Sequence, residues 1–242
     1  MFKKLTADQA TFFCFTPLVS LLTFIIELTL ALYILFRYKT NSFNLLTVVI
    51  ILLLGTFQLS EYMLCTSENL ILWGRIGAAS ITLLPALGLH LITFFTKKSW
   101  LVIAGYIFGV CLMSIIFFLP SLTIDTRCTG KFVILLPQTF YQQIFIFYYV
   151  GFLFIGIFAI IHSLATQTKN YNSLIWMLIG YLSFILPTII VFILYQTTKH
   201  AIPSIMCGFA IFLDVVLSFQ FIPGFNYTIK RIFELSIALD TN

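Results

Sequence analysis

Charged or titratable side chains are rare inside the apolar stretches of this sequence, and they occur at Glu27, Glu61, Arg75, His90, His162 and Asp214. Because an ionisable group in hydrocarbon is costly, each such residue is a candidate for ligand binding, proton transfer or ion pairing. They divide into an outer group near one end of the stretches and an inner group nearer their centres. We expect His162, close to the end of its stretch, to be a core residue bonded to a carbonyl or hydroxyl oxygen.

The outer group follows one face of a predicted helix, with residues at offsets of 3, 4 and 7 from the first: Gln58, Glu61, Tyr62 and Cys65. Arg75 begins the next apolar stretch at similar depth, where an ion pair with Glu61 would neutralise both charges. We predict that Gln58, Glu61, Tyr62 and Arg75 line an outward-facing polar pocket for a small ligand. The alternative is a structural ion pair in which Arg75 only reaches the lipid headgroups.

The inner group consists of Glu27, His90 and Asp214, which we predict to form a polar network within the membrane. A protonated carboxyl group can donate a hydrogen bond inside a helix bundle, which gives Glu27 and Asp214 a neutral form there. A contact between Asp214 and His90 would couple the two helices that carry them and would titrate near neutral pH. The alternative is that each side chain is a satisfied core residue.

Two cysteines fall in loops that we predict on the same, external side of the membrane. Cys65 follows the second apolar stretch and Cys128 follows the fourth, so an oxidising exterior would allow a disulfide between them. Two unpaired thiols are the alternative, because the sequence does not give their separation. For Cys14, Cys111 and Cys207, which lie within stretches, we expect packing as small apolar residues.

The elements that must position these residues are seven apolar stretches, each long enough to span a bilayer: residues 11–36, 43–64, 70–96, 100–120, 138–165, 173–196 and 201–222. Hydrophobic residues make up 61% and charged residues 9% of the 242 positions, a balance that excludes a water-soluble domain. We therefore predict an all-α, integral membrane bundle of seven transmembrane helices over residues 1–222. Residues 223–242 form a short polar cytoplasmic tail.

Basic residues are scattered in ones and twos between the stretches, which fits topology signals and not a nucleic-acid interface. Their distribution favours an external N-terminus and a cytoplasmic C-terminus. No G-x-S-x-G, H-E-x-x-H, Cys-x-x-Cys or P-loop motif occurs, and no Lys lies inside the last stretch to bind retinal. We thus expect no catalysis, no cofactor and no metal.

Two parts of the sequence resemble a known family. Residues 58–65, QLSEYMLC, and 73–95, WGRIGAASITLLPALGLHLITFF, are similar to helices 2 and 3 of the N-terminal seven-transmembrane sensory region of bacterial histidine kinases, where Trp73, Arg75 and Pro85 match the family's pattern. The last stretch and the tail ending IFELSIALDTN are similar to the family's junction with a downstream signalling domain. No kinase or PAS domain follows here, which implies a stand-alone relative or the sensor portion alone.

The resemblance implies an input module in a bacterial cytoplasmic membrane. We expect a receptor-like or sensory protein that couples an external or intramembrane signal to a cytoplasmic signalling partner. The lipid bilayer surrounds its helices, and a homo-oligomer is one assembly that we consider. The alternative is a proton- or ion-coupled transporter of small solutes. A third class is an intramembrane metal-dependent hydrolase using Glu27, His90, His162 and Asp214.

Overall fold

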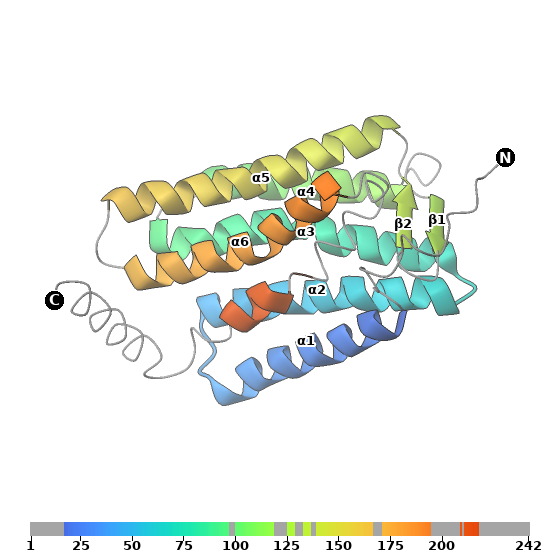
Figure 1. Ribbon diagram of the computed structural model, residues 1–242, viewed down its shortest axis with the longest axis horizontal. Coiled ribbons are helices and arrows are strands. Elements are labelled where there is room, and N and C mark those ends of the chain that lie inside the picture. The colour runs from blue at the N-terminus through green and yellow to red at the C-terminus, as the bar shows by residue number, and fades with distance from the viewer. Residues whose placement is uncertain are drawn as a thin grey trace.

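The computed structural model is a bundle of long helices that run back and forth along one axis (Figure 1). It describes residues 17–96, 100–118, 125–128, 133–136, 139–166, 171–194, 209 and 211–217. Six long helices lie in these ranges: α1 Pro17–Arg37, α2 Ser42–Thr66, α3 Leu70–Thr96, α4 Trp100–Phe118, α5 Thr139–Thr166 and α6 Tyr171–Leu194.

Each of the six helices is long and apolar enough to cross a membrane. Their bounds agree with the first six predicted stretches to within a few residues wherever both ends are described, because uninterrupted apolar runs in lipid leave only the helix to satisfy the backbone. Within the seventh predicted stretch, residues 209 and 211–217 are helical. We call residues 211–217 the C-terminal segment; the rest of residues 201–222, and the predicted tail, lie outside the described residues.

A short antiparallel hairpin, which the apolar pattern does not predict, lies between α4 and α5. It pairs β1 (Asp125–Cys128) with β2 (Val133–Leu136), with Cys128 opposite Val133. Both strands contact α2, and β1 also contacts α3, so the hairpin packs against one end of the bundle (Figure 1). Four-residue strands are too short to show a periodic pattern, and the sequence presents them as a loop.

Residues in the connection from α1 fix the start of α2. The side-chain oxygen of Asn41 accepts a hydrogen bond of 2.8 Å from the backbone N–H of Asn44, which satisfies one of the free donors of the first turn. At the other end, the backbone N–H of Ser67 donates to the carbonyl of Met63. These bonds set the length of the helix that carries Gln58 and Glu61.

The helices pack in a branched order. α2 contacts α1 and α3, α3 also contacts α4 and α5, and α5 contacts α6. The C-terminal segment packs on α6 at Gly180, where an added Cβ would come within 2.8 Å of Leu213 Cδ1. A glycine at this position therefore lets the segment approach α6 closely.

The outside of the bundle is apolar. On α1, Leu18, Leu22, Ile25 and Phe36 are exposed, whereas the opposite face buries Ser20, Thr23 and Glu27. A helix in water shows the reverse arrangement, with its polar face outward. The apolar exterior and the six long helices indicate a multi-pass membrane protein.

A tyrosine from α5 bonds to the backbone of α3 beside Pro85. Pro85 has no N–H, so the carbonyl of Ile81 lacks its usual helical donor, and α3 continues through this point. The buried hydroxyl of Tyr148 donates to the carbonyl oxygen of Thr82 at 3.0 Å and accepts from the backbone N–H of Ala86. The hydroxyl therefore contacts backbone groups on both sides of Pro85.

Two glycines of α4 give this hydroxyl its space. Gly105 and Gly109 have the small-xxx-small spacing that brings membrane helices close together. A Cβ on Gly109 would lie 2.9 Å from the Tyr148 hydroxyl oxygen, and the carbonyl of Gly105 is a second acceptor at 3.4 Å. Three helices thus meet at one phenolic oxygen.

Candidate functional site

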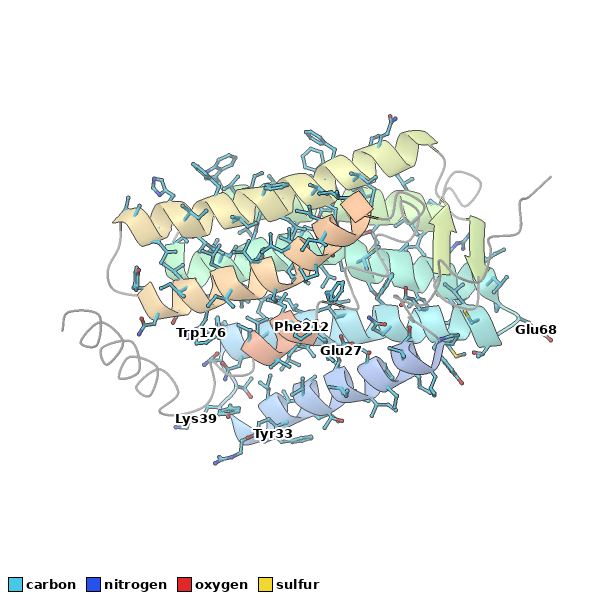
Figure 2. All side chains as sticks on the ribbon, in the orientation of Figure 1. Glu27, Tyr33, Lys39, Glu68, Trp176 and Phe212 are labelled. Atoms are coloured by element: carbon cyan, nitrogen blue, oxygen red, sulfur yellow. The ribbon has the colours of Figure 1, made fainter. Side chains whose placement is uncertain are left out.

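The first helix presents a polar face to the inside of the bundle. Ser20, Thr23 and Glu27 are separated by three or four residues, so they share one side of α1. Glu27 is fully buried, with 0% of its side chain exposed, and it lies between α1 and α2 beside the segment that carries Phe212 (Figure 2). A buried carboxyl group at the centre of a membrane helix is the feature on which the site is built.

Gly55 of α2 makes room for the Glu27 carboxyl group. A Cβ at Gly55 would lie 3.3 Å from Glu27 Oε2 and 3.3 Å from a ring carbon of Phe24. These distances are shorter than ordinary van der Waals contacts, so any larger residue at position 55 would displace the carboxyl group. The absence of a side chain here therefore sets the position of Glu27.

Asp214 of the C-terminal segment meets Glu27. It is also fully buried, and its carboxyl group is close enough to that of Glu27 for the two to interact. A hydrogen bond between two carboxyl groups requires that one of them carries a proton, because two carboxylates have no donor. The structure thus joins the first helix to the C-terminal segment through a pair of acids.

A second polar contact joins α1 to α2 about two turns away from Glu27. The Ser20 hydroxyl donates to Glu61 Oε2 at 3.3 Å, and Glu61 is 4% exposed. Glu61 also acts electrostatically on Glu27. Arg75 is half-buried on α3 and Tyr62 is half-buried on α2, and their predicted roles in an ion pair and an outer pocket stay predictions.

Gln58 lies between these two contacts. On α2 it falls one turn after Gly55 and one turn before Glu61, and it is also between them around the helix axis. Its side chain is 1% exposed, and its amide nitrogen has no hydrogen-bond partner among the described residues. We call the group that these contacts define the polar seam: Ser20, Glu27, Gln58, Glu61 and Asp214.

His90, the third member of the predicted inner network, meets a different partner. Its Nδ1 lies 2.9 Å from the hydroxyl oxygen of Tyr106 on α4, and its ring stacks on Phe94 at a centroid distance of 5.8 Å. The structure therefore shows two polar contacts where the sequence suggests one network: Glu27 with Asp214, and His90 with Tyr106. His162 is exposed on α5 near the ring of Phe158.

Cys65, at the end of α2, is disulfide-bonded. The hairpin strand β1, which ends at Cys128, packs against α2, as a bridge between these two cysteines requires. The identity of the partner stays a prediction. Cys111 of α4 is a free, exposed thiol.

A small apolar cavity of about 40 Å³ lies in the middle of the bundle. Helices α2, α3, α5 and α6 line it together with Leu213 and Leu217 of the C-terminal segment. Leu213 and Leu217, one turn apart on the segment, line the cavity, whereas Asp214 lies about 60–100° around the helix axis from them and interacts with Glu27. The segment is therefore held by apolar packing on one side and by a carboxyl contact on the other.

Among the described residues, no group of three or more His, Cys, Asp or Glu side chains is placed to hold a metal ion. No protein-family model and no curated protein matches the chain. The chemistry that the polar seam supports is hydrogen bonding and proton exchange between carboxyl and amide groups.

Proposed function

We propose that the chain is a receptor-like, sensory membrane module of seven transmembrane helices, with its N-terminus outside and its C-terminus in the cytoplasm. The observation that carries the proposal is the contact between Glu27 and Asp214. It ties the C-terminal segment, which precedes the tail, to the first helix. A change in this contact would alter how the segment packs, and residues 223–242 would pass that change to a cytoplasmic partner.

The outer end of the polar seam is where we propose that an external ligand acts. Gln58 and Glu61 lie on the α2 face toward α1, and Ser20 already binds Glu61. With Tyr62 and Arg75 they would receive a small polar ligand from outside. Binding to Glu61 would compete with Ser20 and shift α1 against α2, which would move Glu27 relative to Asp214.

The resemblance to the sensory region of bacterial histidine kinases supports the same function. It would place the protein in a bacterial cytoplasmic membrane. Because a ligand shifts an equilibrium only through its different affinities for two states, the proposal requires two arrangements of the C-terminal segment. The C-terminal segment has two sets of contacts, one with the polar seam and one with the side chains that line the apolar cavity. Either set can be lost while the other remains.

A second candidate, a proton- or ion-coupled transporter, is favoured by one observation. Glu27, Glu61 and Asp214 are three acids buried within a single bundle, and acids within membrane spans often form proton pathways. A transporter moves a substrate across the membrane, whereas a receptor needs only to change conformation. Flux therefore separates the two candidates.

Spin labels at two exposed positions test the receptor-like relay. Tyr33 on α1 and Phe212 on the C-terminal segment are both exposed and are labelled in Figure 2. In lipid nanodiscs, we expect Asp214→Ala to shift or broaden the distance distribution between the labels and to change the mobility of a third label in residues 223–242. Thr188→Ala is the matched control, because Thr188 is buried but its hydroxyl bonds only to its own helix at Phe184.

The outcomes separate the candidates. A relay predicts that the label distance and the tail label both respond to Asp214→Ala and that liposomes containing the protein conduct no more protons than empty ones. Proton flux that disappears in Glu27→Gln would instead establish the transporter. An unchanged tail label in Asp214→Ala would overturn the relay.

A further inference from the structure

We infer that the apolar cavity between α2, α3, α5, α6 and the C-terminal segment binds a small neutral molecule with one hydrogen-bonding oxygen on a short hydrocarbon chain, as in the short-chain alcohols. Its occupancy would favour the arrangement in which the C-terminal segment is packed on the bundle. This effect on the segment rests on the proposed receptor-like function, whereas binding itself does not.

The lining of the cavity is apolar apart from two tyrosines. Leucine, isoleucine, methionine and phenylalanine side chains make up most of it, and among the described residues that line it only Tyr149 and Tyr181 carry a polar side-chain group. The ring of Tyr149 packs against that of Phe145 at a centroid distance of 5.6 Å. A buried water molecule needs about two to four polar partners, whereas a cavity with apolar walls takes up small apolar molecules. These walls therefore favour hydrocarbon over water.

Tyr181 of α6 is held in a fixed position at the cavity by glycines of two other helices. Its side chain is 4% exposed. A Cβ added to Gly88 of α3 would overlap the Tyr181 hydroxyl oxygen, and a Cβ added to Gly156 of α5 would lie 3.4 Å from the ring carbon Cε1. Gly88 itself lines the cavity. The two glycines thus let the ring approach α3 closely and bring its hydroxyl group to the cavity wall.

The Tyr181 hydroxyl group has no hydrogen-bond partner within the described part of the chain, where its ring packs on that of Phe184 at a centroid distance of 5.9 Å. A buried hydroxyl group is costly to leave without a partner. An oxygen atom of a ligand would accept the phenolic proton in a hydrogen bond, and the hydrocarbon chain of the ligand would lie against the leucines. One polar group in an apolar pocket fixes the orientation of a ligand in this way.

The size of the cavity limits the ligand to a few atoms. Its volume of about 40 Å³ is roughly three times the space that one water molecule needs. This space suits a molecule such as 1-propanol, which has about four non-hydrogen atoms, and it excludes long alcohols. For a ligand of this size the tightest attainable Kd is roughly 40 µM, so we expect a Kd of roughly 0.1–10 mM.

Two leucines connect the cavity to the proposed relay. Leu213 and Leu217 form the part of the cavity wall that belongs to the C-terminal segment. A ligand in the cavity contacts these leucines and the long helices at the same time, and it loses the leucine contacts if the segment moves away. It therefore has a higher affinity for the packed arrangement and shifts the equilibrium toward it.

NMR of the methionine methyl groups of the full chain in lipid nanodiscs tests the inference, with 1-propanol as the probe. Met177 of α6 is fully buried and lines the cavity, whereas Met63 of α2 lies outside the lining and is the internal reference. We expect the ¹³C-methyl resonance of Met177 to shift saturably with added 1-propanol and that of Met63 to show no saturable shift. 1-Octanol partitions more strongly into lipid but is too long for the cavity, so it should not shift Met177 saturably.

Tyr181→Phe keeps the ring and removes the hydroxyl group. We expect it to weaken the binding of 1-propanol about three- to tenfold. Without the alcohol, its stability should be no lower than that of wild type, because the lost hydroxyl group has no partner among the described residues. Tyr171→Phe loses the same atom at an exposed position, and this matched control should bind 1-propanol like wild type.

The outcomes separate the site from the lipid and from the relay. A Met177 shift that grows with the chain length of the alcohol would reveal an effect of the lipid and overturn the site, as would a lack of saturation with 1-propanol. Equal affinity in Tyr181→Phe and wild type would exclude the hydroxyl group as the partner of the ligand. If Met177 titrates and Asp214→Ala changes the tail label in residues 223–242, but 1-propanol does not, the effect on the segment is overturned while the relay stands. If the tail label responds to neither, the relay itself fails.

Discussion

Replacing Tyr148 with phenylalanine removes one hydroxyl group and keeps the ring that packs among α3, α4 and α5. The hydroxyl donates to the Thr82 carbonyl at 3.0 Å and accepts from the Ala86 N–H, which lie on either side of Pro85. Its contact with Gly105 is longer, at 3.4 Å, and contributes less. The substitution therefore removes the side-chain bond from one backbone acceptor and one backbone donor.

The magnitude follows from these two groups. A hydrogen bond contributes about 0.5–1.5 kcal/mol, and a buried group left unsatisfied costs about 1–3 kcal/mol; in membrane proteins, side-chain hydrogen bonds average about 0.6 kcal/mol with a maximum of about 1.7. We expect Tyr148→Phe to lower the free energy of unfolding by about 1–3 kcal/mol. Closure of the helix between Thr82 and Ala86 would place the result at the lower end.

Reversible unfolding of the purified protein in mixed micelles, with increasing SDS, measures this loss. Tyr171→Phe is the control, because Tyr171 is exposed at the start of α6 and loses the same atom. Equal stability of Tyr148→Phe and Tyr171→Phe would refute the contribution of the Tyr148 hydroxyl.

Three other substitutions probe the remaining contacts. Gly77→Val would place a branched side chain on the Ser60 hydroxyl, where even an added Cβ overlaps it, and we expect a loss of about 1–3 kcal/mol in the same unfolding assay; wild-type stability would show that α2 and α3 can separate. Tyr106→Phe removes the partner of His90 Nδ1, so the ¹⁵N resonances of His90 should shift and stability should fall by about 1 kcal/mol; unchanged resonances would argue against the bond. Cys65→Ser removes a disulfide at a cost of about 2–4 kcal/mol, and wild-type Cys65 should react with maleimide only after reduction, so labelling without reductant would contradict the bond.

The positions of the helices were predictable because each apolar run has to form a continuous helix in lipid. α3, expected over residues 70–96, spans Leu70–Thr96. The spacing of Gln58 and Glu61 likewise indicates a shared polar face, and both side chains are buried. These features depend on local periodicity, which the sequence contains in full.

The partners of the polar residues were harder to predict, because they depend on the order and rotation of the helices in the bundle. The sequence predicts Glu27, His90 and Asp214 in one network and names only His90 as a specific partner of Asp214, whereas in the structure Asp214 interacts with Glu27. His90 turns to Tyr106, a residue without any distinguishing pattern in α4. Nothing in the sequence marks Tyr148 as the side chain that bonds to the backbone of α3 beside Pro85.

The pairing of Glu27 with Asp214 also has a consequence for how the protein is made. A ribosome adds about 5–20 residues per second, so roughly 10–40 s pass between synthesis of the two acids. During this interval α1 has to stay in the bilayer with its carboxyl group next to Gly55 and without Asp214. The bond from Ser20 to Glu61 is complete as soon as α2 follows, and it would keep the two helices together at the insertion site until the last part of the chain arrives.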